Sequence, residues 1–211
     1  MSLKLAEEDK IFANILADGK LHVTVPEDTE GAITRKYKTS DGLEGSKTEI
    51  VYSEVKGKIS EIKFYEGNYG RNIQLTITDG EDKPIVVSLS TSSSFGEDLM
   101  KKIIAVDMER VVKIIPYSFL DDKGKSKKGI TLYQKEEGKP AEKVKNYFYD
   151  EEAKKTLHGF PEPKKGKKPL SKDQWKLYFG EVREFLVEKV KEHFKIEDES
   201  MPEVSADEID F

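Results

Sequence analysis

The stretch that most constrains the fold is residues 55–134, because its apolar side chains change their spacing twice. Alternating apolar residues predict three successive strands between residues 55 and 89. Residues 94–106 then carry apolar residues at helical spacing, and alternation returns between residues 111 and 133. This order of three strands, a helix and two strands is that of a five-stranded barrel of the OB type. We therefore predict a mainly β fold with an OB-type barrel at its centre.

Four local signals refine this prediction. The alternation changes phase near Ser60, which predicts a bulge of the kind that bends a barrel strand. Gly57 predicts close backbone approach, and Pro116 predicts that the late part of its strand lies at a sheet edge. Ser94 and Glu97 are spaced as a capping box at the start of the inserted short helix.

The segments outside the barrel are less regular. Residues 5–16 are compatible with a short helix, whereas residues 21–25 alternate as in a half-buried strand. We expect the strands before residue 54 to extend or flank the barrel. Residues 144–149 predict one further strand.

A long amphipathic helix is predicted at about residues 171–194. Ser171 and Gln174 form a second capping-box pattern at its start. Its apolar stripe consists of Trp175, Phe179, Val182, Leu186 and Val190. Such a stripe should pack on the barrel or on a second subunit, so a homodimer is left open.

The net charge of −5 conceals an asymmetry along the chain. Residues 196–211 hold seven of the 41 acids and no base, which leaves 34 acids against 36 Lys and Arg in the remainder. We expect residues 1–195 to form a single OB-fold domain and residues 196–211 to be a disordered acidic tail.

Compartment and membrane association are predicted from what the sequence lacks. It has no cysteine, which fits a reducing compartment. No run approaches the ~18 apolar residues of a membrane span, and no apolar signal core follows the N-terminus. A soluble, cytoplasmic protein without membrane contact is expected.

Motifs for catalysis are weak. His22, His158 and His193 are scattered without metal spacing, so neither a metal nor another cofactor is predicted. Residues 54–56 and 61–63 match the Glu-x-Lys half of a metal-dependent nuclease motif, but no Pro-Asp precedes them. We predict no enzyme activity and no catalytic residue, with a metal-dependent nuclease as a minor alternative.

Cations and aromatic residues interleave at the two places where an OB barrel has the loops that flank its groove. Single-strand binders use such cations for phosphates and such rings for stacking on bases. The predicted DNA-binding residues are Lys63, Tyr65, Tyr69 and Arg71 around the first loop, and Lys113, Tyr117, Phe119, Lys123, Lys125, Lys127, Lys128 and Tyr133 around the second. Arg35, Tyr37 and Lys38 could add to the same surface. The alternative is that the rings cover the core and the lysines only solvate an exposed loop at residues 121–129.

The chain ends in Asp207, Glu208, Ile209, Asp210 and Phe211. A flexible polyanion can occupy a cationic groove in place of nucleic acid. A terminal aromatic residue with a free carboxylate can instead dock on a partner protein. We predict that these five residues bind partners.

Several of these stretches resemble single-stranded DNA-binding proteins of the bacteriophage type. They are residues 57–59, the loop at residues 69–71, the hairpin at residues 121–134 and the acidic end with its terminal Phe. The resemblance implies a protein that coats single-stranded DNA in replication or recombination and recruits other replication or recombination proteins through Asp210 and Phe211. Bacterial relatives of that class carry Pro before the last Phe, whereas this chain carries Asp210. An adaptor that binds only proteins is the main alternative.

Overall fold

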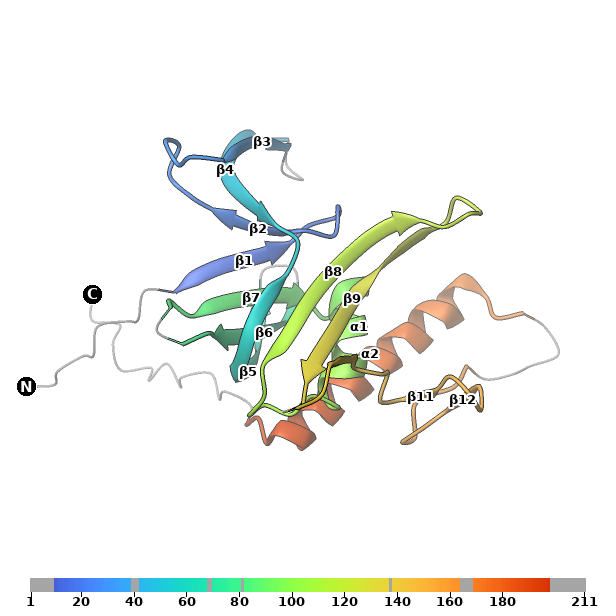
Figure 1. Ribbon diagram of the computed structural model, residues 1–211. Helices are drawn as coiled ribbons and strands as arrows, with labels where there is room; N and C mark the ends of the chain where they lie inside the picture. Colours follow the sequence, from blue (N-terminus) through green and yellow to red (C-terminus); the bar gives the residue numbers. More distant parts are fainter. Residues whose placement is uncertain are drawn as a thin grey trace, which may run out of the picture.

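The computed structural model describes residues 10–38, 42–67, 70–80, 82–136, 138–163 and 169–197 of the 211-residue chain. The described chain is mainly β, with two helices (Figure 1). The strands are β1 (Ile11–Ile15), β2 (Leu21–Thr24), β3 (Ile33–Lys38), β4 (Glu44–Tyr52), β5 (Val55–Gly67), β6 (Gly70–Thr78), β7 (Ile85–Ser90), β8 (Val112–Leu120), β9 (Ser126–Lys135), β10 (Ala141–Lys143), β11 (Tyr149–Asp150) and β12 (Lys155–Thr156). The helices are α1 (Ser94–Ile103) and α2 (Lys172–Phe194).

Ten of these strands form one mixed sheet in the order β10-β9-β8-β5-β6-β7-β1-β2-β4-β3. Within the described residues its neighbours are antiparallel except β1 and β7, which are parallel. The predicted succession of three strands, one helix and two strands is present as β5, β6, β7, α1, β8 and β9. The N-terminal strands extend the sheet beyond β7, as expected.

The sheet does not close into the predicted five-stranded barrel. Closure would require β7 to pair with β9, and no pairing within the described residues joins them. β7 pairs instead with β1, and β9 pairs with β10. Helix α1 bonds to the edge of β9 through Asp98 and Lys102, whose side chains bond to the backbone N–H and C=O of Ile130. Helix side chains thus satisfy the backbone of the part of this edge that β10 does not cover.

Three local predictions are confirmed. The pairing of β5 with β6 shifts register between Ile59 and Glu61, where the bulge was expected. A Cβ on Gly57 would lie 2.5 Å from the carbonyl oxygen of Thr78, so only glycine fits this approach. β8 pairs with β5 only as far as Ile114. Pro116 therefore lies where this edge of β8 no longer pairs with β5.

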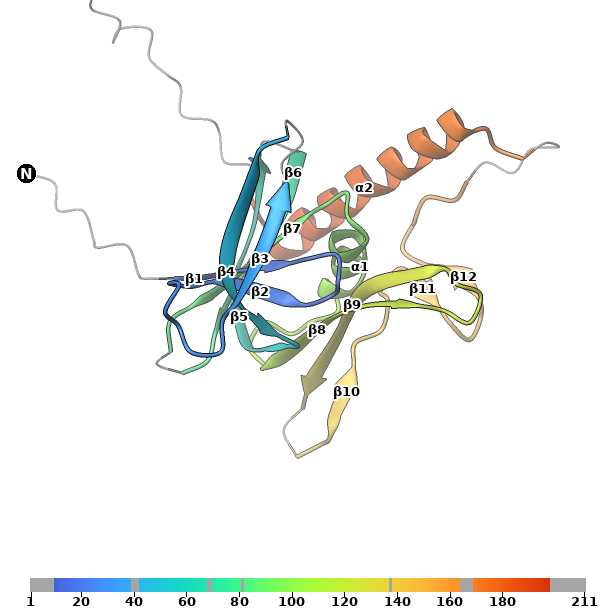
Figure 2. The ribbon, with the colours of Figure 1, turned by 90° about the horizontal axis from the view of Figure 1, so that it is seen from above.

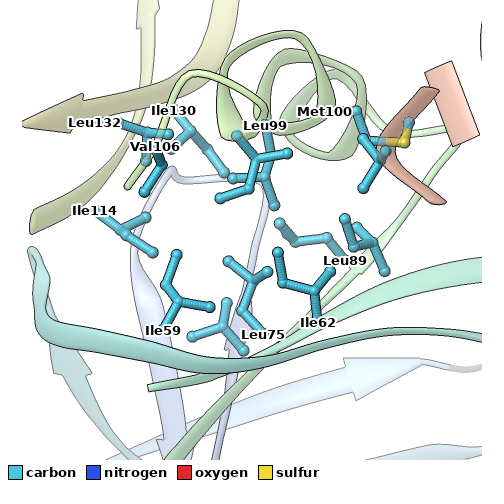
Figure 3. Close-up of a cluster of buried hydrophobic side chains, with 14 of the residues drawn as sticks. Ile59, Ile62, Leu75, Leu89, Leu99, Met100, Val106, Ile114, Ile130 and Leu132 are labelled. Atoms are coloured by element: carbon cyan, nitrogen blue, oxygen red, sulfur yellow. The ribbon is translucent and has the colours of Figure 1, made fainter. Parts of the chain in front are cut away.

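The hydrophobic core lies between α1 and two parts of the curved sheet, β5–β7 and β8–β9 (Figure 3). Alternate residues of β5, β6 and β7 supply one wall, among them Ile59, Leu75 and Leu89. Ile114 and Leu132 supply the opposite wall. Each burial of a Val, Leu or Ile side chain contributes about 1.5–3 kcal/mol, so this alternation determines which face of each strand points inward.

Three sequence-based expectations need correction. Ile11–Ile15 is strand β1 rather than part of a helix, because it pairs with the otherwise open edge of β7. The strand expected at residues 144–149 is absent from residues 144–148, and Tyr149 only begins the two-residue β11. The sheet ends at β10, and Phe148 turns inward to pack against Phe160 and Phe185. The cap of α1 is Ser93, whose side chain accepts the N–H of Gly96, rather than Ser94.

Helix α2 has the predicted bounds but does not pack along its whole length. Ser171 and Gln174 form the reciprocal capping box, and Val182, Leu186 and Val190 are buried. The first part of the helix extends past the body (Figure 2). Trp175 and Phe179 are therefore exposed, at 39% and 45%, although they belong to the same stripe. Neither described helix is long and apolar enough to cross a membrane.

Candidate nucleic-acid interface

The outer face of the sheet carries a row of polar side chains across four neighbouring strands. The row runs from β5 to β1, and each member is the register partner of the next: Lys63 on β5, Gln74 on β6, Ser88 on β7 and Asn14 on β1. The residues next to them in the four strands are buried or partly buried against the core, so these four point away from it. Gln74 Nε2 donates a hydrogen bond to Ser88 Oγ at 3.1 Å.

A second row lies two residues further along the same strands. It contains Tyr65, Asn72 and Ser90, which are again register partners. The ring of Tyr65 is 40% exposed, so it is available on this face for stacking. The Lys63 and Tyr65 side chains that the sequence singled out thus lie on one face, two strands away from Ser88 and Ser90 of β7.

A hollow of about 340 Å³ lies on this face between β7 and the β3–β4 hairpin. Arg35 and Lys47, register partners on β3 and β4, line one side. Asn14 and the serines of β7 and of the following turn line the other side: Ser88, Ser90 and Ser93. Lys47 Nζ lies 5.8 Å from the ring centre of Tyr37, so the hairpin pairs a cation with an exposed ring.

Contacts to the buried carboxylate of Glu49 fix Arg35 in the wall of this hollow. Glu49 is only 3% exposed and accepts two bonds from Arg35, at 2.9 and 2.8 Å. The Arg35 bonds and then that of His22 hold the pKa of Glu49 at about 2. His22 places Nδ1 2.9 Å from Glu49 and Nε2 3.0 Å from Asp18.

A smaller hollow of about 260 Å³ adjoins the turn after β7. Thr91 and Ser92 line it, together with Arg71 and with Gly180 and Arg183 of α2. Arg71 bonds to Glu66 at 2.9 Å and to Glu184 at 2.8 Å, which raises its pKa and ties β6 to α2. Residues 88–93 therefore connect the two hollows along one side of the molecule.

The β8–β9 hairpin extends past β5 as a two-stranded arm (Figure 1). The predicted exposed loop at residues 121–129 is a tighter turn at residues 121–125, because Lys127 and Lys128 belong to β9. Asp121 holds this turn by accepting the N–H groups of Lys123 and Lys125. Of the exposed loop expected at residues 121–129, residues 126–129 thus belong to β9, and residues 121–125 form the turn.

One face of the arm gathers five of the predicted residues. Register pairs and strand alternation place on it Lys113, Tyr117, Phe119, Lys127 and Tyr133. The rings of Tyr117 and Phe119 are 5.7 Å apart, and Phe119 is 55% exposed. Lys128 is the partner of Ser118, so it lies on the opposite face.

Two contacts join the arm to the rest of the molecule, one with the β1–β2 turn and one with α1. The β1–β2 turn abuts the arm, since a Cβ on Gly19 would lie 2.4 Å from the backbone nitrogen of Ser118. The Tyr117 hydroxyl and the Asp98 carboxylate both lie within 2.5 Å of the Cβ position of Gly129. Burial and then the Asp98 charge raise the pKa of Tyr117, so this hydroxyl stays protonated and can donate a hydrogen bond.

The structure sorts the predicted residues into three groups. Lys63 and Tyr65 lie on the outer face, Arg71 is bound by two carboxylates, and the other described residues lie on the arm or at its tip. Tyr69 and the tail residues lie outside the described residues. Asn14, Lys47, Ser88 and Ser90 were not predicted, because polar residues alternating in a strand indicate only a solvent-facing side.

Comparison of the chain with family models, with curated proteins and with solved structures gives no significant match. Within the described residues, no group of three His, Asp or Glu side chains could hold a metal ion. Glu54 and Glu61, the acids of the nuclease-like pattern, pair with Lys113 at 3.5 Å and with Lys63 at 3.0 Å.

Proposed function

We propose that this chain binds single-stranded DNA on the outer face of its sheet, as a non-enzymatic protein of DNA replication or recombination. The observation that carries the proposal is the hollow in which Arg35 and Lys47 face the hydroxyl groups of Ser88 and Ser90. Cations suit phosphates, hydroxyls suit sugars and base edges, and Tyr65 and Tyr37 offer rings nearby.

The strand order supports an open OB-type barrel. β5 pairs with both β6 and β8, as the first strand of that fold does, and α1 bonds to β9, whose pairing with β7 would close the barrel. OB folds bind oligonucleotides on the face of their second and third strands. Those strands correspond to β6 and β7, which carry Gln74, Asn72, Ser88 and Ser90 on their outer face.

The mechanism combines neutralisation and stacking. Lys47 and Lys63 contact phosphates, bases stack on Tyr65 and Tyr37, and the aromatic face of the β8–β9 arm flanks the strand. Every base has a π face, so stacking gives little sequence preference. The acidic tail at residues 196–211 competes with DNA for these cations, and its tip is then free to recruit replication or recombination proteins.

Fluorescence anisotropy with labelled oligo-dT tests this proposal. Wild type should bind oligo-dT more tightly than duplex of the same length, and log K should fall with log salt by about 0.7 per phosphate contacted. Lys47→Ala should reduce this slope, and Tyr65→Ala should weaken binding by about 1–3 kcal/mol. Lys139→Ala, which removes an exposed lysine paired with Glu136, is the matched control.

Equal affinity for duplex, or binding unaffected by salt, would refute the proposal. The same samples with Mg²⁺ should leave the oligonucleotide intact, and its cleavage would instead indicate the nuclease alternative.

An apolar hollow of about 950 Å³ favours a protein-binding adaptor as the second candidate. It lies on the inner side of β1, β2 and β4, where Ile11, Val23 and Tyr52 line it. Lys10, Lys56 and Lys83 also line it, so an acidic peptide with an apolar end would fit. Calorimetry with such peptides tests this candidate. Peptide binding without any binding of oligo-dT would favour the adaptor.

A further inference from the structure

The first half of α2 carries an exposed pair of aromatic rings. The rings of Trp175 and Phe179 are 5.5 Å apart and tilted by only 24°, and both are substantially exposed. They continue the stripe that buries Val182 and Leu186 further along the helix. The first part of the helix extends past the body (Figure 2). The stripe therefore ends in two exposed rings.

Cations stand next to these rings. Lys172 precedes Trp175 by three positions and Lys176 precedes Phe179 by three, which makes each pair neighbours on the helix surface. Both lysines are exposed. Lysines beside exposed rings are the combination that single-stranded nucleic acid recognises.

Gly180 is a second, independent feature of the same helix. It lies inside α2, where glycine is less favourable than alanine. No atom outside its immediate surroundings lies within 4 Å of the position of a Cβ, so packing does not require glycine. The residue lines the hollow that contains Arg71 and Arg183. Glu66 and Glu184, which bind Arg71, also line this hollow, so within the described residues Arg183 is its cation without a carboxylate partner. The bare backbone of Gly180 leaves room for a ligand to approach closely.

We propose that this half of α2 is a second contact for single-stranded nucleic acid, with bases stacked on Trp175 and Phe179 and phosphates near Lys172, Lys176 and Arg183. It continues the path from the outer face through the turn at residues 88–93, which borders both hollows. This inference rests on the proposed function. The occupant is inferred from this continuity, because Gly180 and Arg183 line the hollow that Thr91 and Ser92 of the turn also line.

Intrinsic fluorescence gives a direct test, because Trp175 is the only tryptophan of the chain. Saturating oligo-dT should quench its emission, and added salt should reverse the quenching as it releases the DNA. Heparin, a polyanion without bases, should displace the oligonucleotide without quenching. Unchanged emission at an oligonucleotide concentration that saturates the anisotropy signal would overturn the inference.

An oligo-dT length series gives the second test. An OB fold covers about 4–16 nucleotides, so the helix should add affinity only for longer strands. Trp175→Ala with Phe179→Ala should leave short oligonucleotides unaffected and weaken long ones by at least about fivefold, the equivalent of one lost stack. Leu177→Ala is the control, since it removes a 69% exposed side chain from the same helix half.

Gly180→Ala separates a binding role from a structural one. Alanine should raise the melting temperature, because it favours the helix, and should still weaken binding of long oligonucleotides. If wild type binds no oligo-dT, the proposed function itself fails. If wild type binds but the aromatic variant keeps the same length dependence, only this inference fails. An aromatic variant that changes the sedimentation coefficient instead would show a self-association surface and overturn it as well.

Discussion

The carboxylate of Asp98 accepts the backbone N–H of Ile130 at 2.7 Å and thereby joins α1 to β9. Lys102, one turn later on the helix, donates to the carbonyl of the same residue at 2.6 Å and to Asp98 at 2.7 Å. Both backbone groups of Ile130 are thus satisfied by a helix where a strand would otherwise be needed.

Asp98→Ala should therefore destabilise the protein. The change leaves the Ile130 N–H and the mostly buried Lys102 without a carboxylate, and losing bonds to such groups costs about 1–3 kcal/mol. Urea denaturation followed by circular dichroism measures the effect. Asp107→Ala removes an exposed carboxylate paired with Arg110 and should change the unfolding free energy much less. Equal losses in both variants would contradict this role for Asp98.

The contacts of Glu49 with Arg35 and His22 predict a dependence of stability on pH. The pKa of Glu49 is about 2 in the folded protein, against 4.5 for a free side chain. The contacts that lower this pKa stabilise the ionised carboxylate of the folded protein, so they contribute fully above about pH 4.5. Their contribution is lost as the pH falls towards 2 and the carboxylate is protonated. Its size is on the order of 3 kcal/mol, from about 1.4 kcal/mol for each pKa unit.

Denaturation of wild type and Glu49→Gln at pH 6 and pH 3 checks this prediction. The difference between the two proteins should be larger at pH 6 than at pH 3. Glu54→Gln, which alters a half-exposed carboxylate, is the control. A Glu49→Gln penalty that is the same at both pH values would refute the assigned cause.

Strand content was predictable because alternation depends only on which side of a strand is buried. Residues such as Ile73, Leu75 and Ile77 alternate cleanly, and the structure buries all three. Barrel closure was not predictable, because it depends on which edges meet. Ile11–Ile15 carries no pattern that shows it will pair in parallel with β7.

The candidate site was predictable only where cations and rings stood out in the sequence. Lys127 and Lys128 look alike in a lysine-rich run, yet one residue of register puts them on opposite faces. Trp175 and Phe179 fit a buried stripe, and no sequence pattern near them shows that the helix extends beyond the rest of the fold. Ser88 and Ser90 gain significance only when Arg35 and Lys47 fold opposite them.

The tail predicts a change in affinity without a change in stability. Deleting residues 196–211 removes seven acids and no base. If the tail competes for the same cations, oligo-dT should bind more tightly, most clearly at low salt. Anisotropy titrations measure the affinity and thermal unfolding measures the fold, in which Ile196 only borders the core. Weaker binding with unchanged melting would contradict competition.

The two faces of the β8–β9 arm give the sharpest comparison, because adjacent lysines serve as site and control. Lys127 is the register partner of Phe119 on the aromatic face, and Lys128 is the partner of Ser118 on the other. Lys127→Ala should weaken oligo-dT binding and lower the salt slope by about 0.7, the value for one phosphate on a single strand. Lys128→Ala removes the same charge from the same strand and should leave the slope unchanged. Because both variants alter net charge equally, a general electrostatic effect predicts equal slopes. Equal slopes would therefore remove the arm from the interface and leave the outer face alone as the binding surface.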